Sequence, residues 1–317
     1  MARYFKNILP IIAILICAGV YFARPKVREQ SVSASAFNTI CTIRVWSKKD
    51  CSKEFAALLS LLQELHDCLN IYDAQSELSR LNASAATQDF QCSPLLWECL
   101  ERSRKAYEIT DGAFDITVGP LMQLWGFHGK RQTLPTDQEI ADALAKVGLH
   151  KVVFNDEERT VRFTKGGMRL DLGGIVKGHA CGMIAKALLS SEIDTFLLDF
   201  GGNICVSQKP PPGRDAFSIG IRDPNAPDSL IATKRLKGVT IATSGNYERS
   251  RVIDGQRVGH IMDPKSGRPG HFFKSVTAIT PEGYLADALS TAIFIGGQPL
   301  AEKVKTQISE TSFLIVE

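Results

Sequence analysis

The sequence predicts an α+β fold: one compact body of two closely packed lobes with mixed sheets, preceded by an N-terminal hydrophobic segment. Three observations support this prediction. The chain has 317 residues, 44% hydrophobic and 22% charged, which is ordinary for a globular protein with a sizeable core. Strand-like and helix-like stretches follow one another, and no linker divides the chain after residue 37. Residues 8–22, in contrast, are apolar and uncharged throughout.

This apolar stretch, 8–22, follows two basic residues and is typical of the hydrophobic region of an export signal. As a helix it would reach about 23 Å, less than the roughly 30 Å of a bilayer core. Cleavage at residues 34–36, an uncleaved anchor favoured by the basic residues that follow, a lipid on Cys17 and a buried N-terminal helix all remain open. We expect residues 1–36 to be a signal peptide or membrane anchor. The body, residues 37–317, would then lie at the periplasmic face of a bacterial inner membrane or in the periplasm.

The charge balance gives no indication of a nucleic-acid partner. The formal net charge is +3, but residues 1–36 contain five of the 37 Lys and Arg and only one of the 34 Asp and Glu. The remainder is therefore close to neutral, whereas a nucleic-acid-binding surface requires a basic stripe. Seven of the eight cysteines fall in this remainder without a zinc-binding spacing, and they can be disulfide-bonded or buried as thiols.

The elements of the first half follow from periodicity and capping signals. Residues 41–46 alternate as a strand, and a 3.6-residue apolar stripe predicts a helix from a Ser52 cap to Leu69. Ser93 and Pro94 open a second helix that ends near Gly112. A capping box at 136–139 begins a third, ending at Gly148, and residues 151–163 form a hairpin.

The second half alternates strands with two helices. One helix follows the glycine turn of "LDLGGI" (170–175), which is echoed by "LDFGGN" (198–203), and the other spans "LADALSTAIFIGG" (285–297). The expected strands lie at 195–200, 217–222, 238–242, 275–280 and 312–316.

Three oxygen-bearing side chains lie on one turn of the 285–297 helix. Asp287 and Thr291 share a face because they are four residues apart, and Ser290 lies beside them. A carboxylate with hydroxyl and carbonyl oxygens suits Mg²⁺, which takes about six oxygen ligands. Alternatively, Asp287 is simply a capping carboxylate that accepts free N–H groups at a helix N-terminus.

The stretch "LDLGGIVKGHACG" (170–182) places Asp171 at a strand end, then glycines, then a helix containing Lys177. Glycines and a helix N-terminus favour phosphate, and Lys177 adds a cation, although tight turn packing explains the glycines equally well. We interpret His179 as an ordinary histidine rather than a ligand.

Three further stretches offer candidates. Asp115 lies in "DGAFDITVGPLMQLWGF" (111–127), where an acid beside aromatics can bind a planar heterocycle, or the stretch is a turn entering the core. Tyr72 can stack on an aromatic ligand. His260 and Asp263, in "GHIMDPKSGRP", are candidates for proton transfer or, for the latter, turn formation.

In this order, these motifs closely resemble the ApbE-type FAD:protein FMN transferases. The motifs are "YDAQSELSRLN", "GAFDITVGPLMQLWGF", "LDLGGIVKG", "LLDFGGNI", "IRDP", "IATSGNYER", "GHIMDPKSGRP" and "SVTAITPEGYLADALSTAIFIGG". The resemblance covers residues 37–317 and implies an ApbE-like fold. It also implies that Mg²⁺ assists cleavage of FAD, that FMN is joined through its phosphate to a Thr or Ser of a partner protein, and that AMP is released.

The resemblance also implies site residues and partners. The metal would be held by Asp287, Ser290, Thr291 and the carbonyl of Gly174. The expected FAD contacts are Phe37, Tyr72, Ala113, Phe114, Asp115, Asp171, Lys177, His260 and Ile261. Acceptors in the family are exported or membrane-bound electron-transfer subunits with a short Asp-(Gly/Ala)-x-(Ser/Thr)-Gly-Ala-(Ser/Thr) motif.

Two positions depart from the family pattern. Phe37 begins an "FNT" sequence where the family shows "MGT", and Gly182 replaces a common acidic residue. In the implied mechanism Lys177 and glycine amides spread the phosphate charge, and His260 or Asp263 takes the acceptor proton. The alternatives are a Mg²⁺-dependent FAD pyrophosphatase giving FMN and AMP, and a non-catalytic FAD-binding protein.

Overall fold

The computed structural model describes residues 26–226, 228–246, 250–270 and 272–317. The apolar segment 8–22, on which the export prediction rests, lies outside these residues. Across the described ranges, none of the helices is both long enough and apolar enough to cross a membrane.

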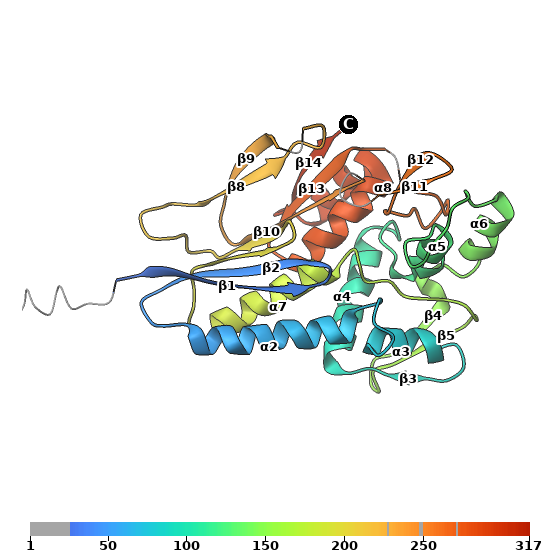
Figure 1. Ribbon diagram of the computed structural model, residues 1–317, viewed down its shortest axis with the longest axis horizontal. Helices are drawn as coiled ribbons and strands as arrows, with labels where there is room; N and C mark the ends of the chain where they lie inside the picture. Colours follow the sequence, from blue (N-terminus) through green and yellow to red (C-terminus); the bar gives the residue numbers. More distant parts are fainter. Residues whose placement is uncertain (1–25, 227, 247–249, 271) are drawn as a thin grey trace, which may run out of the picture.

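The first half of the chain is helix-rich (Figure 1). Its elements are β1 (Arg28–Ala36), β2 (Thr39–Ser47), α2 (Ser52–Leu69), α3 (Glu77–Ser84), β3 (Phe90–Gln91), α4 (Pro94–Ile109), η1 (Ile116–Val118), α5 (Gly119–Leu124), α6 (Asp137–Leu144), η2 (Leu149–Lys151), β4 (Val152–Asn155) and β5 (Thr160–Phe163).

The second half contributes most of the strands and two long helices. Its elements are α7 (Val176–Ser190), β6 (Phe196–Phe200), β7 (Asn203–Val206), β8 (Phe217–Arg222), β9 (Leu230–Leu236), β10 (Val239–Gly245), β11 (Ser250–Ile253), β12 (Gln256–Gly259), β13 (Ser275–Thr280), α8 (Gly283–Gln307) and β14 (Ser312–Val316).

A seven-stranded sheet organises the larger lobe, in the order β1-β2-β6-β7-β10-β13-β14. Every strand pairing among the described residues is antiparallel, so the α+β class is confirmed but the expectation of mixed sheets is wrong. The sheet also begins earlier than expected. Residues 28–36 form β1 and pair with β2 along their whole length, so residue 36 is not a boundary of the folded sheet.

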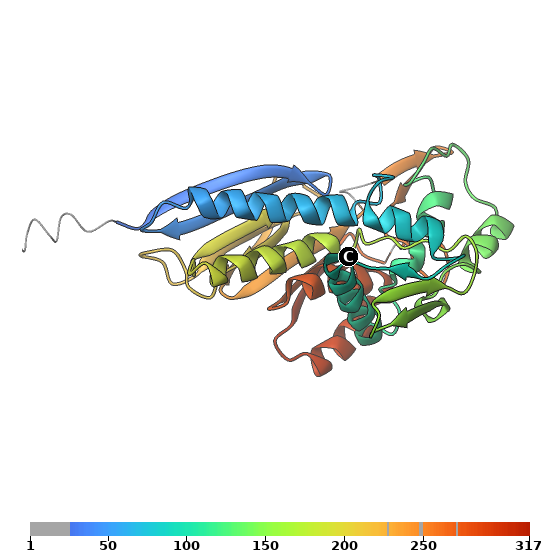
Figure 2. The same ribbon diagram turned by 90° about the horizontal axis from the view of Figure 1, so that it is seen from below.

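Helices and strands cover opposite faces of this sheet. Helices α2, α7 and α8 lie on one face, with α2 and α7 side by side in Figure 2. The hairpin of β8 and β9 covers the other face, where Phe217, Ile219 and Ile221 pack against Ile241 and Ile279. The alternating burial of β8 follows its alternating sequence, as expected for a strand with one buried face.

The smaller lobe consists of α5, α6 and the hairpin of β11 and β12. Its separate core forms around Leu121, Trp125 and Val258, and the Trp125 Nε1–H donates to the Gly267 carbonyl at 2.9 Å. The described residues thus form two packed lobes, as the sequence predicts, and the larger lobe has a buried cluster on each face of its sheet.

The capping signals are mostly confirmed. The side chain of Ser93 accepts from the Leu96 N–H, and Thr136 and Glu139 form a reciprocal capping box. The Ser52 prediction is wrong in detail, because Cys51 is the N-cap residue and the Ser52 hydroxyl donates to Asp50 instead. The helices begun by Ser93 and Thr136 end at Ile109 and Leu144, earlier than the glycines that we expected to end them.

All seven cysteines of the described residues are buried free thiols. Burial, as the largest effect, raises the pKa of the Cys68 thiol to about 12 and the pKa of the Cys41 thiol to about 11. The thiols of Cys68 and Cys41 are therefore protonated and pack in the core as small apolar groups.

Candidate active site

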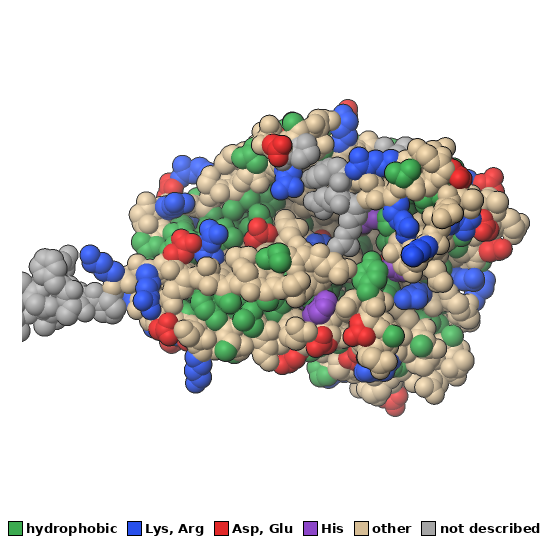
Figure 3. All heavy atoms as spheres, viewed as in Figure 1, with side chains coloured by type: hydrophobic (Ala, Val, Ile, Leu, Met, Phe, Trp, Pro, Cys, Tyr) green, Lys and Arg blue, Asp and Glu red, His purple; other side chains and the backbone are tan. Residues whose placement is uncertain are grey.

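A cavity of about 310 Å³ lies where the two lobes meet. Figure 3 shows histidine side chains near the centre of this face, and Lys and Arg side chains over the region of α5, α6, β11 and β12. The predicted site residues that line the cavity are Phe37, Tyr72, Phe114, Asp115, Asp171, Gly174, Lys177, His260, Ile261, Asp287 and Thr291. Ala113, Asp263 and Ser290, which were also predicted, are not part of the lining.

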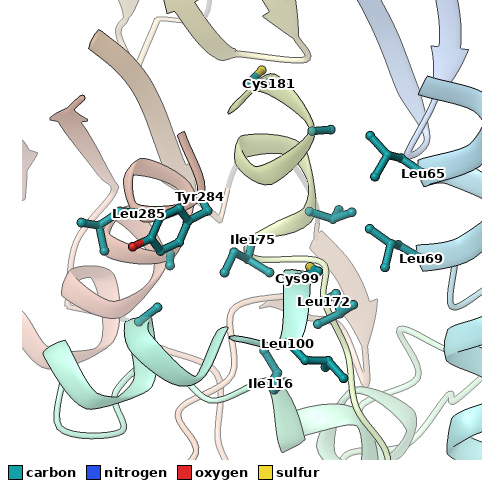
Figure 4. Packing of buried hydrophobic residues seen from close by; sticks show 14 of the residues in the cluster. Leu65, Leu69, Cys99, Leu100, Ile116, Leu172, Ile175, Cys181, Tyr284 and Leu285 are labelled. Carbon is teal, nitrogen blue, oxygen red and sulfur yellow. The ribbon is translucent and has the colours of Figure 1, made fainter. Parts of the chain in front are cut away.

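Helix α7 runs between α2 and α8, with Ile175 just before its start and Cys181 further along it (Figure 4). Gly178 and Gly283 allow α7 and α8 to cross with their backbones in contact. A Cβ on Gly178 would lie 2.2 Å from the Gly283 carbonyl oxygen, closer than real atoms approach. This crossing places the first turn of α8 beside the N-terminus of α7.

Asp287 links these two helices. It is 4% exposed, and its Oδ2 accepts the Gly178 N–H at 3.0 Å. Its Oδ1 accepts from Asn203 Nδ2 at 3.2 Å and lies 3.5 Å from Lys177 Nζ. Asp287 therefore does cap a helix N-terminus, but that helix is α7 rather than its own, and its other oxygen remains on the cavity side.

Hydroxyl groups surround the next turn of α8. Ser244 Oγ lies 2.8 Å from Ser290 Oγ and 3.3 Å from Thr291 Oγ1. Ser290 is fully buried and donates to the Asp287 carbonyl at 2.9 Å, so it lies behind the cavity wall rather than in it. Gly174 is adjacent to Thr291, because a Cβ built on the glycine would lie 3.3 Å from Thr291 Oγ1.

This donor set fits a magnesium ion that completes its shell with other ligands. Among the described residues, no group of three or more His, Cys, Asp and Glu side chains could hold a metal ion, so an all-protein cage is absent there. The carboxylate of Asp287, the hydroxyl of Thr291 and the backbone of Gly174 nevertheless line the same cavity, and Gly174 lies beside Thr291. Mg²⁺ is commonly bound in this way, by few protein oxygens together with water and phosphate.

A second group lies around Asp171, which comes from the segment before α7. Its Oδ1 accepts the Gly173 N–H at 2.7 Å, and its Oδ2 lies 2.8 Å from Nε2 of His128. Burial disfavours the charge of Asp171, but the His128 side chain and the Gly173 N–H more than compensate, so its pKa is lowered. The His128 ring also meets Tyr72 edge to face, at 5.7 Å between centroids and 85° between planes.

Asp115 has its carboxylate satisfied within the chain. Oδ1 accepts from the Thr117 N–H at 2.7 Å and its hydroxyl at 2.6 Å, and Oδ2 accepts from the Leu149 N–H at 3.2 Å. Burial raises its pKa, against the opposing effect of these donors. This carboxylate caps η1 and lies beside Phe114 in the lining of the cavity.

Phe37 reaches the cavity from the two-residue turn between β1 and β2. Phe37 and Asn38 both have positive φ, 52° and 59°, as the type I′ hairpin turn requires. Asn tolerates this conformation best after Gly, which explains how "FNT" can replace a glycine-containing sequence. The Phe37 N–H donates to His66 Nδ1 at 3.1 Å, which helps to hold the turn.

The two proton-transfer candidates separate in the structure. His260 lines the cavity and contacts Phe127, with 6.4 Å between ring centroids. Asp263 is held in a turn, where its Oδ1 accepts the Lys265 N–H at 2.9 Å. The structure therefore does not bring Asp263 to the site, because its carboxylate serves the turn chemistry of "DPKSGRP".

Sequence reasoning missed His128, Asn203 and Ser244. Each contacts a predicted site residue, but each belongs to a segment that was singled out for another residue or for its glycines. His128 follows directly after the "WGF" sequence, and Asn203 directly after the "GG" turn. Both are polar residues that directly follow a predicted site motif, and this position is the signal by which the sequence could have identified them.

Comparison with known proteins gives a consistent result. The ApbE family model matches residues 37–314. The FAD:protein FMN transferase of Treponema pallidum is 33% identical over 304 residues, 90% of this chain and 84% of that protein. The ApbE protein of Thermotoga maritima has a TM-score of 0.83 at 32% identity, covering 91% of this chain and 94% of its own. Flavin Transferase ApbE from Vibrio cholerae gives 0.81 at 27% identity, covering 91% and 93%. The matched range thus includes both lobes and contains every predicted site residue.

Proposed function

This chain belongs to the ApbE family, a family of transferases, and from that premise we propose that it transfers the FMN part of FAD to another protein. The support from similarity is the name FAD:protein FMN transferase carried by its relative in Treponema pallidum. The support from geometry is the composition of the cavity between the lobes.

One observation carries the proposal. Asp287, Thr291 and Lys177 line the same cavity as Tyr72 and Asp171. The first three suit a divalent cation and phosphate oxygens, whereas an aromatic ring and a carboxylate acceptor suit a planar heterocycle that carries N–H groups. FAD combines a diphosphate with such heterocycles in one molecule, so a single ligand would use both sets of residues.

We propose Mg²⁺ as the cofactor, held by the Asp287 carboxylate, the Thr291 hydroxyl and the Gly174 carbonyl. Ser290 would support this set from behind, through its contacts with Ser244 and the Asp287 carbonyl. When bound, the ion would supply positive charge to the diphosphate oxygens.

The remaining chemistry belongs to side chains of the cavity. Lys177 would pair with a phosphate oxygen, and Tyr72 and Asp171 would hold a heterocycle. His260 would accept the proton of an acceptor Thr or Ser hydroxyl as its oxygen bonds to the FMN phosphorus. The bond from that phosphorus to the bridging oxygen would break, and AMP would leave with the bridging oxygen.

The acceptor would be an exported or membrane-bound electron-transfer subunit with a Thr or Ser in the short motif given above. The proposed test incubates this protein with FAD, Mg²⁺ and an acceptor domain that carries the motif. We expect an acceptor mass increased by covalently bound FMN, and one AMP released per adduct. Acceptor that keeps its mass while FAD is bound but intact would overturn the proposal in favour of a non-catalytic binding protein.

The same reaction distinguishes transfer from hydrolysis. A pyrophosphatase would release free FMN and AMP at a rate that the acceptor does not change. For a transferase, added acceptor converts free FMN into adduct, so the ratio of adduct to free FMN rises with acceptor concentration.

We also propose that the apolar segment 8–22 directs export, which would place the cavity on the periplasmic side. A fusion of residues 1–36 to a reporter enzyme that is active only outside the cytoplasm tests this. Reporter activity equal to that of a fusion lacking the segment would contradict it.

A further inference from the structure

We propose that His128 is a positioning residue of the FAD site, which fixes both the Asp171 carboxylate and the Tyr72 ring without contacting the ligand. This inference rests on the function proposed above. It concerns a residue that is absent from the cavity lining, although both of its partners are present there.

The position of His128 supports this role. Its side chain is 3% exposed and Asp171 is 9% exposed, so the contact between Nε2 and Oδ2 at 2.8 Å is shielded from water. Neither ring nitrogen makes a well-aligned hydrogen bond among the described residues, so the close approach of Nε2 to the Asp171 carboxylate is the one short polar contact of the ring there. The contact with Asp171 is therefore the polar interaction that orients the ring.

The contact with Tyr72 links a second element to the same ring. Tyr72 is 53% exposed, on the loop after α2, where an aromatic side chain has room to change rotamer. The edge-to-face contact with His128 restricts it. His128 lies on the loop after α5, so one side chain of the smaller lobe joins two segments of the larger lobe.

The chemical consequence concerns the hydrogen bonds available to the ligand. Because Asp171 is ionised, it accepts hydrogen bonds and does not donate them. Gly173 occupies Oδ1 and His128 faces Oδ2, which fixes the plane of the carboxylate and leaves lone pairs for a ligand. The site would thus select a heterocycle edge that carries an N–H donor, stacked against the Tyr72 ring.

The test measures FAD affinity by fluorescence titration for His128→Phe, His128→Gln and a buried control, His179→Phe. His128→Phe retains a ring for Tyr72 but leaves Asp171 without its partner, so we expect FAD to bind about tenfold more weakly. His128→Gln retains a donor, and we expect at least partial rescue of this loss. His179 is equally buried but outside the cavity, and its variant should bind FAD like the unmodified protein.

A double-mutant cycle with Asp171→Asn separates positioning from general disruption. If His128 acts through Asp171, His128→Phe should weaken FAD binding about twofold or less when it is added to the Asp171→Asn variant. Equal losses in the unmodified protein and in that variant would overturn the proposal, as would unchanged affinity in the His128→Phe single variant. Transfer kinetics provide a second readout, since a positioning role raises KM for FAD and leaves kcat nearly constant.

Two controls keep these outcomes interpretable. Thermal unfolding checks that each variant is folded, and His128→Leu replaces the Phe variant in the same comparison if the larger ring does not fit. If the unmodified protein binds no FAD, the proposed function itself fails. If it binds FAD and His128→Phe binds equally well, only the role of His128 fails.

Discussion

Asp287 has two roles that a single substitution can separate. One oxygen accepts the Gly178 N–H at the start of α7, and the other faces Lys177 and the cavity. Asp287→Asn retains the size and the carbonyl acceptor but removes the charge that would bind Mg²⁺. We expect FMN transfer to fall by about 100-fold or more, with a melting temperature changed by less than about 3 °C.

The measurements are adduct formation by mass spectrometry, Mg²⁺ binding by calorimetry with FAD present, and thermal unfolding. Asp142→Asn, on the exposed face of α6, serves as the matched control and should preserve transfer. Unchanged transfer in Asp287→Asn would exclude this carboxylate from the metal site.

His179 gives the pH dependence that the fold imposes on stability. Burial, assisted by the charge of Arg102, lowers the pKa of His179 to about 4, whereas an unfolded histidine titrates near about 6.5. The unfolded chain therefore binds the proton first as the pH falls. Stability is lost between pH values of about 6.5 and 4, by up to roughly 3 kcal/mol. We expect His179→Phe to remove this part of the slope.

Urea unfolding at several pH values measures the effect. If the free energy of unfolding falls equally for the unmodified protein and for His179→Phe between pH values of about 6.5 and 4, the prediction is wrong. Above a pH of about 6.5 the pKa difference predicts no contribution to the slope, so any difference there reports packing.

At this scale the sequence predicted contacts that lie within one motif. Asp287 and Thr291 were assigned to one helix face by their spacing alone. The contacts between His128 and Asp171, and between Asn203 and Asp287, join segments 43 and 84 residues apart, and no local pattern predicts them. Asp263 was misassigned for a related reason. A carboxylate in this motif can act as a proton acceptor or can accept backbone N–H groups in a turn, and the sequence does not distinguish these two roles.

Among the elements, the crossing of α7 and α8 determines where the site residues lie. Gly178→Ala would place a methyl group against the Gly283 carbonyl, so the helices must separate. We expect a loss of about 3 kcal/mol in the free energy of unfolding, together with weaker FAD binding. Gly182→Ala on the same helix is the matched control, because nothing lies within 4 Å of its added Cβ.

Gly182→Ala should stabilise the protein by up to about 1 kcal/mol, since alanine favours helix. Denaturant unfolding of both variants measures the difference. If Gly178→Ala and Gly182→Ala stabilise the protein equally, the claim that the backbones of α7 and α8 are in contact at Gly178 is wrong.

The elements predicted best are those with one clearly buried face. The apolar stripe of α2 and the alternation of β8 follow this rule. Strands β1 and β9 were missed because they lie at sheet edges and are mostly exposed, which leaves little apolar periodicity to detect. The predicted end of the 285–297 helix coincides with a break in α8 at Gly297, where φ is 74°, and a second helical stretch then runs to Gln307.

At the scale of the whole molecule, the sheet order could not be derived from the sequence. Strand β2 pairs with β6 across more than 140 residues, and β7 pairs with β6 on one side but with β10 on the other, whereas β8 and β9 form a separate hairpin. Antiparallel pairing throughout the described residues also contradicts the mixed sheets expected from alternating strands and helices. Such long-range pairing depends on which faces pack together, and local periodicity carries no information about that.

The first strand provides the test at this scale, because β1 was assigned to the export segment and lies in the sheet instead. Removing residues 1–25 retains the whole β1–β2 ladder, from the pair Arg28 and Ser47 to the pair Ala36 and Thr39. Removing residues 1–36 deletes the edge strand, so Phe37 loses the hairpin that holds it at the cavity. We expect the shorter truncation to preserve melting temperature and FAD affinity, and the longer one to lower the melting temperature by more than about 5 °C. Equal melting temperatures for the two truncated proteins would mean that β1 contributes nothing to the fold. In that case the body would begin near residue 37 after all.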